Sequence, residues 1–266
     1  MTAEKTAPAF GWRAYGLGVM AVGAVCLAWR DCEPGQAVPL GLPDRTILAI
    51  AAALFMLAAG AAVLFRRTVV WGAAALTVYY GLIVFLLLNG AVIIANYPVY
   101  GAYSSAAEQL ALAAAGLIVF ARFAKIDAVL AANLTRGSQL AFGICAVLFG
   151  GAHFFYLNLT VPLVPKWLPP SQLFWAYVTG IAHIAAGIAI LTGVQARLAA
   201  TLLTVMYASF TPLVHVPIVL AHPHIFFNWT ENALNIALTG AAWVVADSLA
   251  ARAFIHAPRH TRGVPH

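Results

Sequence analysis

Four long stretches of this chain contain no Asp, Glu, Lys or Arg, and they set the strongest limit on how it can fold. They cover residues 68–107, 138–165, 167–196 and 198–230. A transmembrane helix needs about 20 apolar residues, and in lipid only a helix or a closed barrel satisfies every backbone hydrogen-bonding group. In the whole chain 63% of residues are hydrophobic and 8% are charged, whereas soluble domains average about 45–50% and about 25%. The sequence therefore predicts an integral membrane protein rather than a soluble enzyme or a disordered chain.

Glycine, proline and asparagine residues divide the apolar stretches into about eight helices. Apolar and polar residues do not alternate, and Ala, Leu and Gly dominate, so we expect helices rather than a β-barrel. We predict an all-α, polytopic membrane protein with spans near residues 12–30, 46–65, 69–95, 104–122, 138–157, 172–193, 196–220 and 228–251.

The basic residues predict the orientation of these spans. With eight helices, eleven of the fourteen Lys and Arg residues fall on the side that carries both termini, which leaves Arg30, Arg45 and Lys166 on the other. Cytoplasmic loops are enriched in Lys and Arg, so we expect both termini in the cytoplasm and the chain in the cell inner (plasma) membrane. The net charge of +6 then reflects orientation, and the expected partner is the lipid bilayer rather than a nucleic acid.

The second half of the chain repeats the first at a shift of 126 or 127 residues, or 124 near the end. The repeat predicts two tandem four-helix bundles running in the same direction, at 1–122 and 138–251. A cytoplasmic linker at 123–137 would join them, and a cytoplasmic tail at 252–266 would follow. The matching pairs are Val38-Pro39 with Val164-Pro165, Leu42-Pro43 with Leu168-Pro169, Ala58-Ala59-Gly60 with Ala185-Ala186-Gly187, Gly16 with Gly143, Gly23 with Gly150, and Gly116 with Gly240.

The segment from Val164 to Gly193, VPKWLPPSQLFWAYVTGIAHIAAGIAILTG, followed by ARLAATLL, resembles the signature region of the DoxX-like family of small four-helix membrane proteins. The resemblance runs from about 138 to 250, and the first half is similar only as a degenerate copy. It implies an association with membrane redox systems, because some members of that family are subunits of a thiosulfate:quinone oxidoreductase and a related group serves amine-dehydrogenase maturation. It supplies no catalytic residue set.

Polar side chains are costly within a membrane and usually face the bundle interior or a cavity. In the second half they form stripes on successive helices, because residues three or four apart share one face of a helix. We expect these stripes, together with a histidine pair in the following outer loop, to line one outward-facing pocket. They consist of Cys145 and His153; Thr179 and His183; Thr204, Tyr207, Thr211 and His215; Asn228, Glu231, Asn232, Asn235 and Thr239; and the loop residues His222 and His224.

We predict that this pocket binds a quinone-like or small electron-donating substrate, because histidine titrates near neutral pH and can pass the protons that accompany quinone reduction. The predicted catalytic residues are His153, His183, His215 and Glu231, and the predicted substrate-binding residues are Tyr207, Thr211, Asn232, Asn235 and Thr179. The first half has Cys26, Met56 and Leu88 in place of the three histidines, so we expect the second half to be the active unit and the first half its scaffold.

Other interpretations remain open from the sequence. A transition metal (copper, zinc or iron) could be held by His153, His183, His215, His222 and His224. The same histidines could instead be neutral and join helices through hydrogen bonds to Thr or to backbone carbonyls. The chain could be an oxidoreductase, a membrane subunit or assembly factor with a redox partner protein, or a carrier of a small solute. Cys26 and Cys32 could form a disulfide, although nothing in the sequence requires one.

Overall fold

The computed structural model describes residues 9–255, with side chains described up to residue 250. The described chain is all-α and contains no strand. Eight of its helical segments are long and apolar enough to cross a membrane, which confirms the predicted fold class. These segments are Gly11–Trp29, Arg45–Leu64, Val69–Ala95, Tyr100–Phe123, Ala128–Phe155, Gln172–Thr192, Ala196–Ala221 and Phe226–Ala250.

Two of the eight segments change their hydrogen-bonding pattern partway along. The third consists of α3 (Val69–Thr77), the π-helical η2 (Val78–Asn89) and α4 (Gly90–Ala95), and the seventh of α9 (Ala196–Phe210), the π-helical η4 (Thr211–His215) and α10 (Val216–Ala221). At a shift of 127 the second π-helical segment falls within the first. The other helices are α1 (Gly11–Trp29), α2 (Arg45–Leu64), α5 (Tyr100–Phe123), α6 (Ala128–Phe155), α8 (Gln172–Thr192) and α11 (Phe226–Ile255), with the short η1 (Pro34–Gln36), α7 (Leu157–Thr160) and η3 (Val161–Leu163) in loops.

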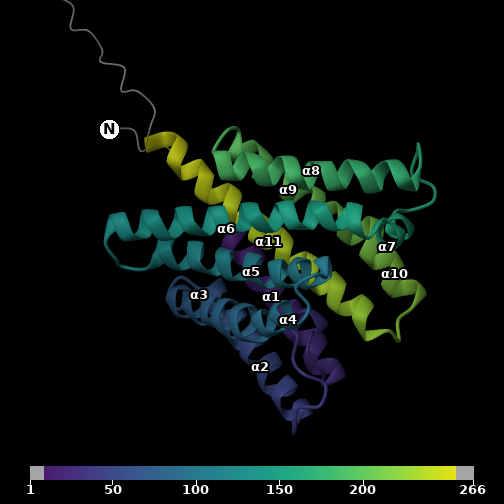
Figure 1. Cartoon of the computed structure of the whole chain (residues 1–266). Helices are drawn as coiled ribbons and strands as arrows, with labels where there is room; N and C mark the ends of the chain where they lie inside the picture. The colour runs from purple at the N-terminus through teal and green to yellow at the C-terminus, as the bar shows by residue number, and fades with distance from the viewer. Residues whose placement is uncertain (1–8, 256–266) are drawn as a thin grey trace, which may run out of the picture.

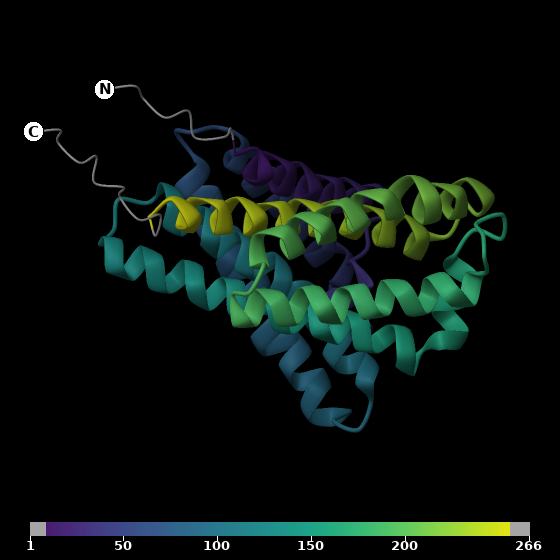
Figure 2. The ribbon, with the colours of Figure 1, turned by 90° about the horizontal axis from the view of Figure 1, so that it is seen from above.

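Most helices run along one common direction (Figure 1), and α1 begins at the end of the molecule where α11 finishes (Figure 2). We call this end the terminal end. The opposite, distal end carries the loops at 30–44, 96–99, 156–171 and 222–225. An even number of spans returns the chain to its starting side. The start of α1 and the end of α11 therefore share one end, as the predicted topology requires.

The sequence repeat has a geometric counterpart in two equivalent helix crossings. A Cβ atom built at Gly16 in α1 would lie 2.9 Å from the carbonyl oxygen of Gly60 in α2. At the equivalent place, a Cβ at Gly143 in α6 would lie 3.2 Å from the carbonyl oxygen of Gly187 in α8. The first two helices of both halves therefore cross at the same residues, where the missing side chains let the backbones touch.

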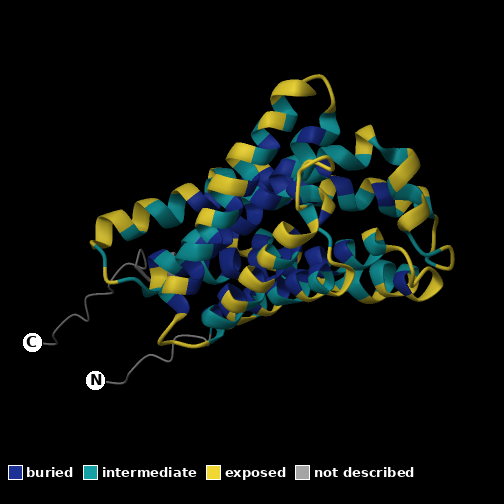
Figure 3. Ribbon diagram, turned by 90° about the horizontal axis from the view of Figure 1, so that it is seen from below, coloured by how far each residue is buried: buried dark blue, intermediate teal, exposed yellow. Residues whose placement is uncertain are grey.

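The two halves share one core rather than forming separate bodies. Helix α1 packs most extensively against α11, and α6 packs against α5, so the first helix of each half lies against the last helix of the other. One hydrophobic cluster runs from Trp12 to Leu249, and Figure 3 shows the buried residues gathered along the middle of the molecule. Close contact depends on small residues, since a Cβ at Gly18 would lie 2.3 Å from the Cα of Ala237.

The predicted linker at 123–137 is largely wrong, because α6 already begins at Ala128. Asp127 caps the helix by accepting hydrogen bonds from the N–H groups of Val129 and Leu130, at 2.9 and 3.0 Å. Arg136, on the third turn of α6, donates to the carbonyls of Ile190 and Leu191 at the end of α8. The charged residues that suggested a loop therefore start the helix and tie it to its neighbour. Of the predicted tail, residues 256–266 lie outside the described part.

Candidate functional site

Two of the predicted histidines come together on neighbouring helices. The rings of His153 in α6 and His183 in α8 have centroids 5.2 Å apart. The His183 Nδ1–H donates to the Thr179 carbonyl oxygen at 2.7 Å, and the Thr179 hydroxyl lies 3.3 Å from His153 Nδ1. A carbonyl can only accept, so this bond fixes the tautomer of neutral His183 and leaves its Nε2 as an acceptor.

Tyr207 in α9 completes the cluster with a polar group that has no partner. Its ring centroid is 5.3 Å from that of His183, and Phe149 and Phe210 flank the same imidazole at 6.4 Å. Tyr207 is 3% exposed, and its hydroxyl makes no hydrogen bond within the described chain. A buried hydroxyl usually has a partner, so its position here is suited to donate to a bound molecule. We refer to His153, Thr179, His183 and Tyr207 as the His–Tyr site.

The helix around Tyr207 is shaped by Pro212 and Asn235. In the π-helical turn the N–H of position 212 would pair with the Tyr207 carbonyl, but proline has no N–H. The Asn235 side-chain amide donates to that carbonyl at 2.9 Å and to the Thr211 hydroxyl at 2.9 Å. Thr211 and Asn235, which we predicted to bind substrate, therefore hold α9 against α11.

An apolar cavity of about 330 Å³ lies between α8 and α9, the two helices that carry His183 and Tyr207. At one end it is lined by Ala182, Ala186 and Met206, which neighbour these two residues in sequence. The cavity extends toward the terminal end, where Ala189 and Leu198 line it. Its apolar lining suits an apolar chain, and none of the four residues of the His–Tyr site belongs to that lining.

The remaining predicted histidines do not join the site. No hydrogen bond or ring contact links His215 to His153 or His183 in the described structure. His222 and His224 are exposed in the distal loop. Among the described residues no group of three or more His, Cys, Asp and Glu side chains is arranged to hold a metal ion. The five predicted metal ligands therefore do not converge, because only His153 and His183 meet and His222 and His224 lie in a loop.

Among the described residues, no hydrogen bond or ion pair joins Glu231 to the histidines with which it was predicted to act. The charges that act on it come from Glu33 and Glu108, two residues that the sequence reasoning left aside. Gln109, beside Glu108 in α5, donates from Nε2 to Glu33 Oε2 at 3.1 Å. Glu108 ends the uncharged stretch 68–107 and carries a rare charge within a span, which is the signal that could have singled it out. Asn232 is near Glu231, and its side-chain oxygen is buried without a partner.

In the first half, the residues equivalent to the His–Tyr site make their hydrogen bonds to other side chains of the protein. Met56 and Tyr80 correspond to His183 and Tyr207 at a shift of 127. The Tyr80 hydroxyl donates to the Met56 sulfur at 3.2 Å, and Gln36 of η1 reaches the same sulfur with Nε2 at 3.5 Å. Tyr79 donates to Gln36 Oε1 at 2.9 Å. A loop residue thus occupies this place in the first half, whereas the Tyr207 hydroxyl remains free in the second.

Comparison with known proteins corrects one expectation. A family model described as a domain of unknown function (DUF8561) matches residues 142–246, which lie in the second half. No curated protein and no solved structure matches the chain. The expected membership of the DoxX-like family is wrong, because the segment that carried the resemblance matches this other family. Short runs of Ala, Gly and Pro recur wherever membrane helices pack closely, so they do not identify a family.

Proposed function

We propose that this chain is a multi-pass protein of the cell inner membrane that binds a quinone-like molecule at the His–Tyr site, with both termini in the cytoplasm. The observation that carries the proposal is the buried Tyr207 hydroxyl, which has no partner among the described residues, on a ring that lies beside the neighbouring imidazoles of His183 and His153. A carbonyl head group would accept the hydrogen bond that Tyr207 can donate. His183 Nε2 could accept a hydrogen bond from a hydroxyl on the same ligand.

The surroundings support an amphiphilic ligand. The His–Tyr site lies near the middle of α8, and the adjoining cavity of about 330 Å³ is apolar. A quinone combines a ring with carbonyl acceptors and a long apolar tail, and it moves within the lipid. The tail would lie between α8 and α9, and the phenyl rings of Phe149 and Phe210 would adjoin the head. In this proposal the chain holds and positions the ligand, and a redox partner protein of the same membrane would exchange electrons with it.

Tyr207→Phe tests the proposal sharply, because it removes only the unpaired hydroxyl. The variant should fold at least as stably as wild type, while the Kd for a decyl-substituted benzoquinone should rise about 10-fold, the effect of one lost hydrogen bond. Binding can be measured by titration calorimetry on full-length protein in lipid nanodiscs, together with mass spectrometry of co-purified quinones. The matched control is Tyr80→Phe, which removes the equivalent hydroxyl of the first half and should leave the Kd unchanged.

Two outcomes would contradict the proposal that the His–Tyr site binds a quinone. If wild type binds no benzoquinone, or if Tyr207→Phe and Tyr80→Phe bind it equally well, the His–Tyr site does not hold this ligand. The alternative of a non-enzymatic subunit, assembly factor or small-solute carrier, in which the histidines join helices, would then be favoured.

A further inference from the structure

Three glutamates gather near the distal end, where the two halves of the molecule meet. Glu33 lies in the loop after α1, Glu108 in α5 and Glu231 in α11. Glu33 and Glu108 both lie beside Gly35, and Glu231 is on the second turn of α11 at the same end. Within the part of the chain that the structure describes, the one ion pair joins Arg45 to Asp31, so no basic side chain pairs with any of the three.

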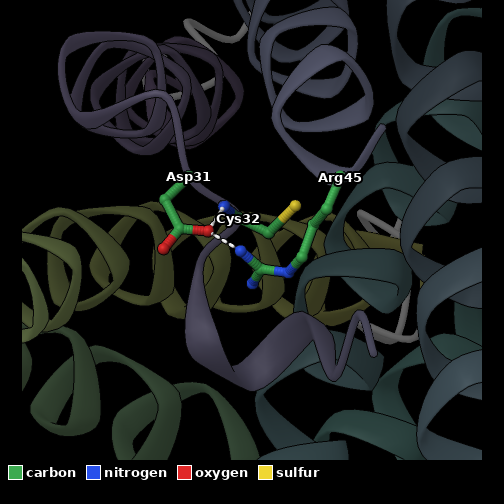
Figure 4. Close-up of polar contacts among 3 residues, drawn as sticks. All are labelled: Asp31, Cys32 and Arg45. Carbon is green, nitrogen blue, oxygen red and sulfur yellow. Dashed lines mark hydrogen bonds and ion pairs between the residues drawn. The ribbon is translucent and has the colours of Figure 1, made fainter. Parts of the chain in front are cut away.

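The backbone at Gly35 lets polar atoms from two elements converge. A Cβ at this glycine would lie 2.9 Å from Glu33 Oε1, 2.9 Å from Gln109 Nε2 and 3.2 Å from Glu108 Oε2. Any larger residue would separate these groups. The loop is held in place by Asp31, which accepts from the Arg45 guanidinium and from the Cys32 N–H (Figure 4). Gly35 is also fixed from the other side, because Asn89 donates to its carbonyl at 3.0 Å.

An unpaired acceptor gives an independent indication that something binds here. Gln109 is fully buried and uses Nε2 to bond Glu33, and its Oε1 has no partner among the described residues. Its carboxamide therefore brings a free acceptor into a cluster that already consists of carboxylates. Buried acceptors need donors, and no described residue supplies one to this oxygen. A ligand that supplies several N–H groups and positive charge would satisfy both requirements.

The spacing favours an organic cation over a metal ion. The three carboxylates do not form a group arranged around one metal position in the described structure. At the same end of α1 and α11, the ring of Trp29 lies 5.8 Å from the rings of both Phe226 and Trp229. Aromatic faces attract ammonium and guanidinium groups, so aromatic rings at the same end as the carboxylates suit an organic cation.

We propose that Glu33, Glu108, Glu231 and Gln109 form a binding site for a small organic cation that carries an ammonium or guanidinium group and enters from the distal side. Glu33 is 2% exposed, whereas Glu108 and Glu231 are partly buried. The site shares no residue with the His–Tyr site, so it stands whether or not the quinone proposal holds.

The test uses the full-length protein in nanodiscs, with butylammonium and guanidinium as probes. Butanol and urea serve as neutral counterparts, and Na⁺ and Ca²⁺ as metal ions. We expect wild type to bind the two organic cations in preference to all other probes. In a Glu108→Gln/Glu231→Gln variant the Kd should rise about 10- to 100-fold, because two charge-assisted hydrogen bonds are lost. Circular dichroism and gel filtration check that the variant is folded.

Asp247→Asn is the matched control, because Asp247 is a carboxylate of the same helix as Glu231 near the terminal end and bonds the Gly11 N–H at 3.0 Å. This variant should bind the probes as wild type does. The proposal is overturned if wild type binds no organic cation, if Na⁺ or Ca²⁺ binds more tightly than both organic cations, or if the double variant and Asp247→Asn retain equal affinity.

Discussion

At the scale of single residues, this protein contains buried polar groups that are not all satisfied by the chain itself. The free hydroxyl of Tyr207 and the free carboxamide oxygen of Gln109 mark two different sites. Glu33 differs from both, since it lies outside the spans and its carboxylate already accepts from Gly35 N–H and Gln109 Nε2. Burial raises its pKa from 4.5 to about 7, although these hydrogen bonds act in the opposite direction.

The raised pKa of Glu33 predicts a pH-dependent stability. The folded protein holds the Glu33 proton more tightly than the unfolded chain does, so this contribution is fully present below about pH 4.5. It is lost as the pH rises through about 7. Glu33→Gln should remove this dependence, so that the variant loses about 3 kcal/mol less stability than wild type between pH 4 and pH 8. Unfolding by denaturant at both pH values, in the same detergent, measures the difference.

Asp44→Asn is the control for this prediction, since Asp44 is an exposed carboxylate of the same loop. Its pH profile should follow that of wild type. A Glu33→Gln profile parallel to wild type would show that Glu33 ionises as freely in the folded protein as in the unfolded chain.

At the scale of helices, small residues decide how closely the elements approach. A Cβ at Gly150 in α6 would lie 2.5 Å from Ile184 Cγ1 and 2.6 Å from the Gly180 carbonyl oxygen. The second of these atoms belongs to a backbone and cannot move without shifting α8. A Cβ at the equivalent Gly23 in α1 would lie 2.9 Å from the Ala53 carbonyl oxygen. Glycine therefore permits the same close helix crossing in both halves.

Gly150→Ala should therefore destabilise the protein by about 1–3 kcal/mol, because the added methyl group overpacks the α6–α8 crossing. Gly137→Ala on the same helix is the matched control. It meets nothing within 4 Å and should be neutral or stabilising by up to about 1 kcal/mol, since alanine favours helix. Denaturant titration of both variants in detergent measures the effect. Equal stabilities would mean that α6 and α8 do not cross as closely as described.

At the scale of the whole molecule, the two halves run in the same direction, and the first helix of each half packs against the last helix of the other. Helix α11 packs against α1 as well as α5 and α9, so the second half completes the core of the first. The start of α1 and the end of α11 consequently lie at one end, and the carboxylate cluster and the exposed histidine loop near the other. The proposed orientation places the distal end outside the cell.

Reporter fusions test this orientation. Alkaline phosphatase inserted in the loop at 156–171 should be active, because this enzyme needs an oxidising compartment outside the cytoplasm. Green fluorescent protein fused to the C-terminus should fluoresce, which it does in the cytoplasm. An inactive phosphatase at 156–171 with an active one at the C-terminus would reverse the orientation, and the proposed cation would then enter from the cytoplasm.

The sequence alone determined the eight apolar helices and the equivalence of the two halves, because hydrophobic length and repeated glycines are local properties of the chain. It also predicted the pair His153 and His183, which lie on consecutive helices. It could not predict that Glu33 and Glu108 both lie beside Gly35, or that no hydrogen bond or ring contact among the described residues joins His215 to the other two histidines. Those outcomes depend on contacts between residues far apart in the chain. Only the tertiary structure decided them, because the rotation and pairing of helices are fixed by packing across the whole core.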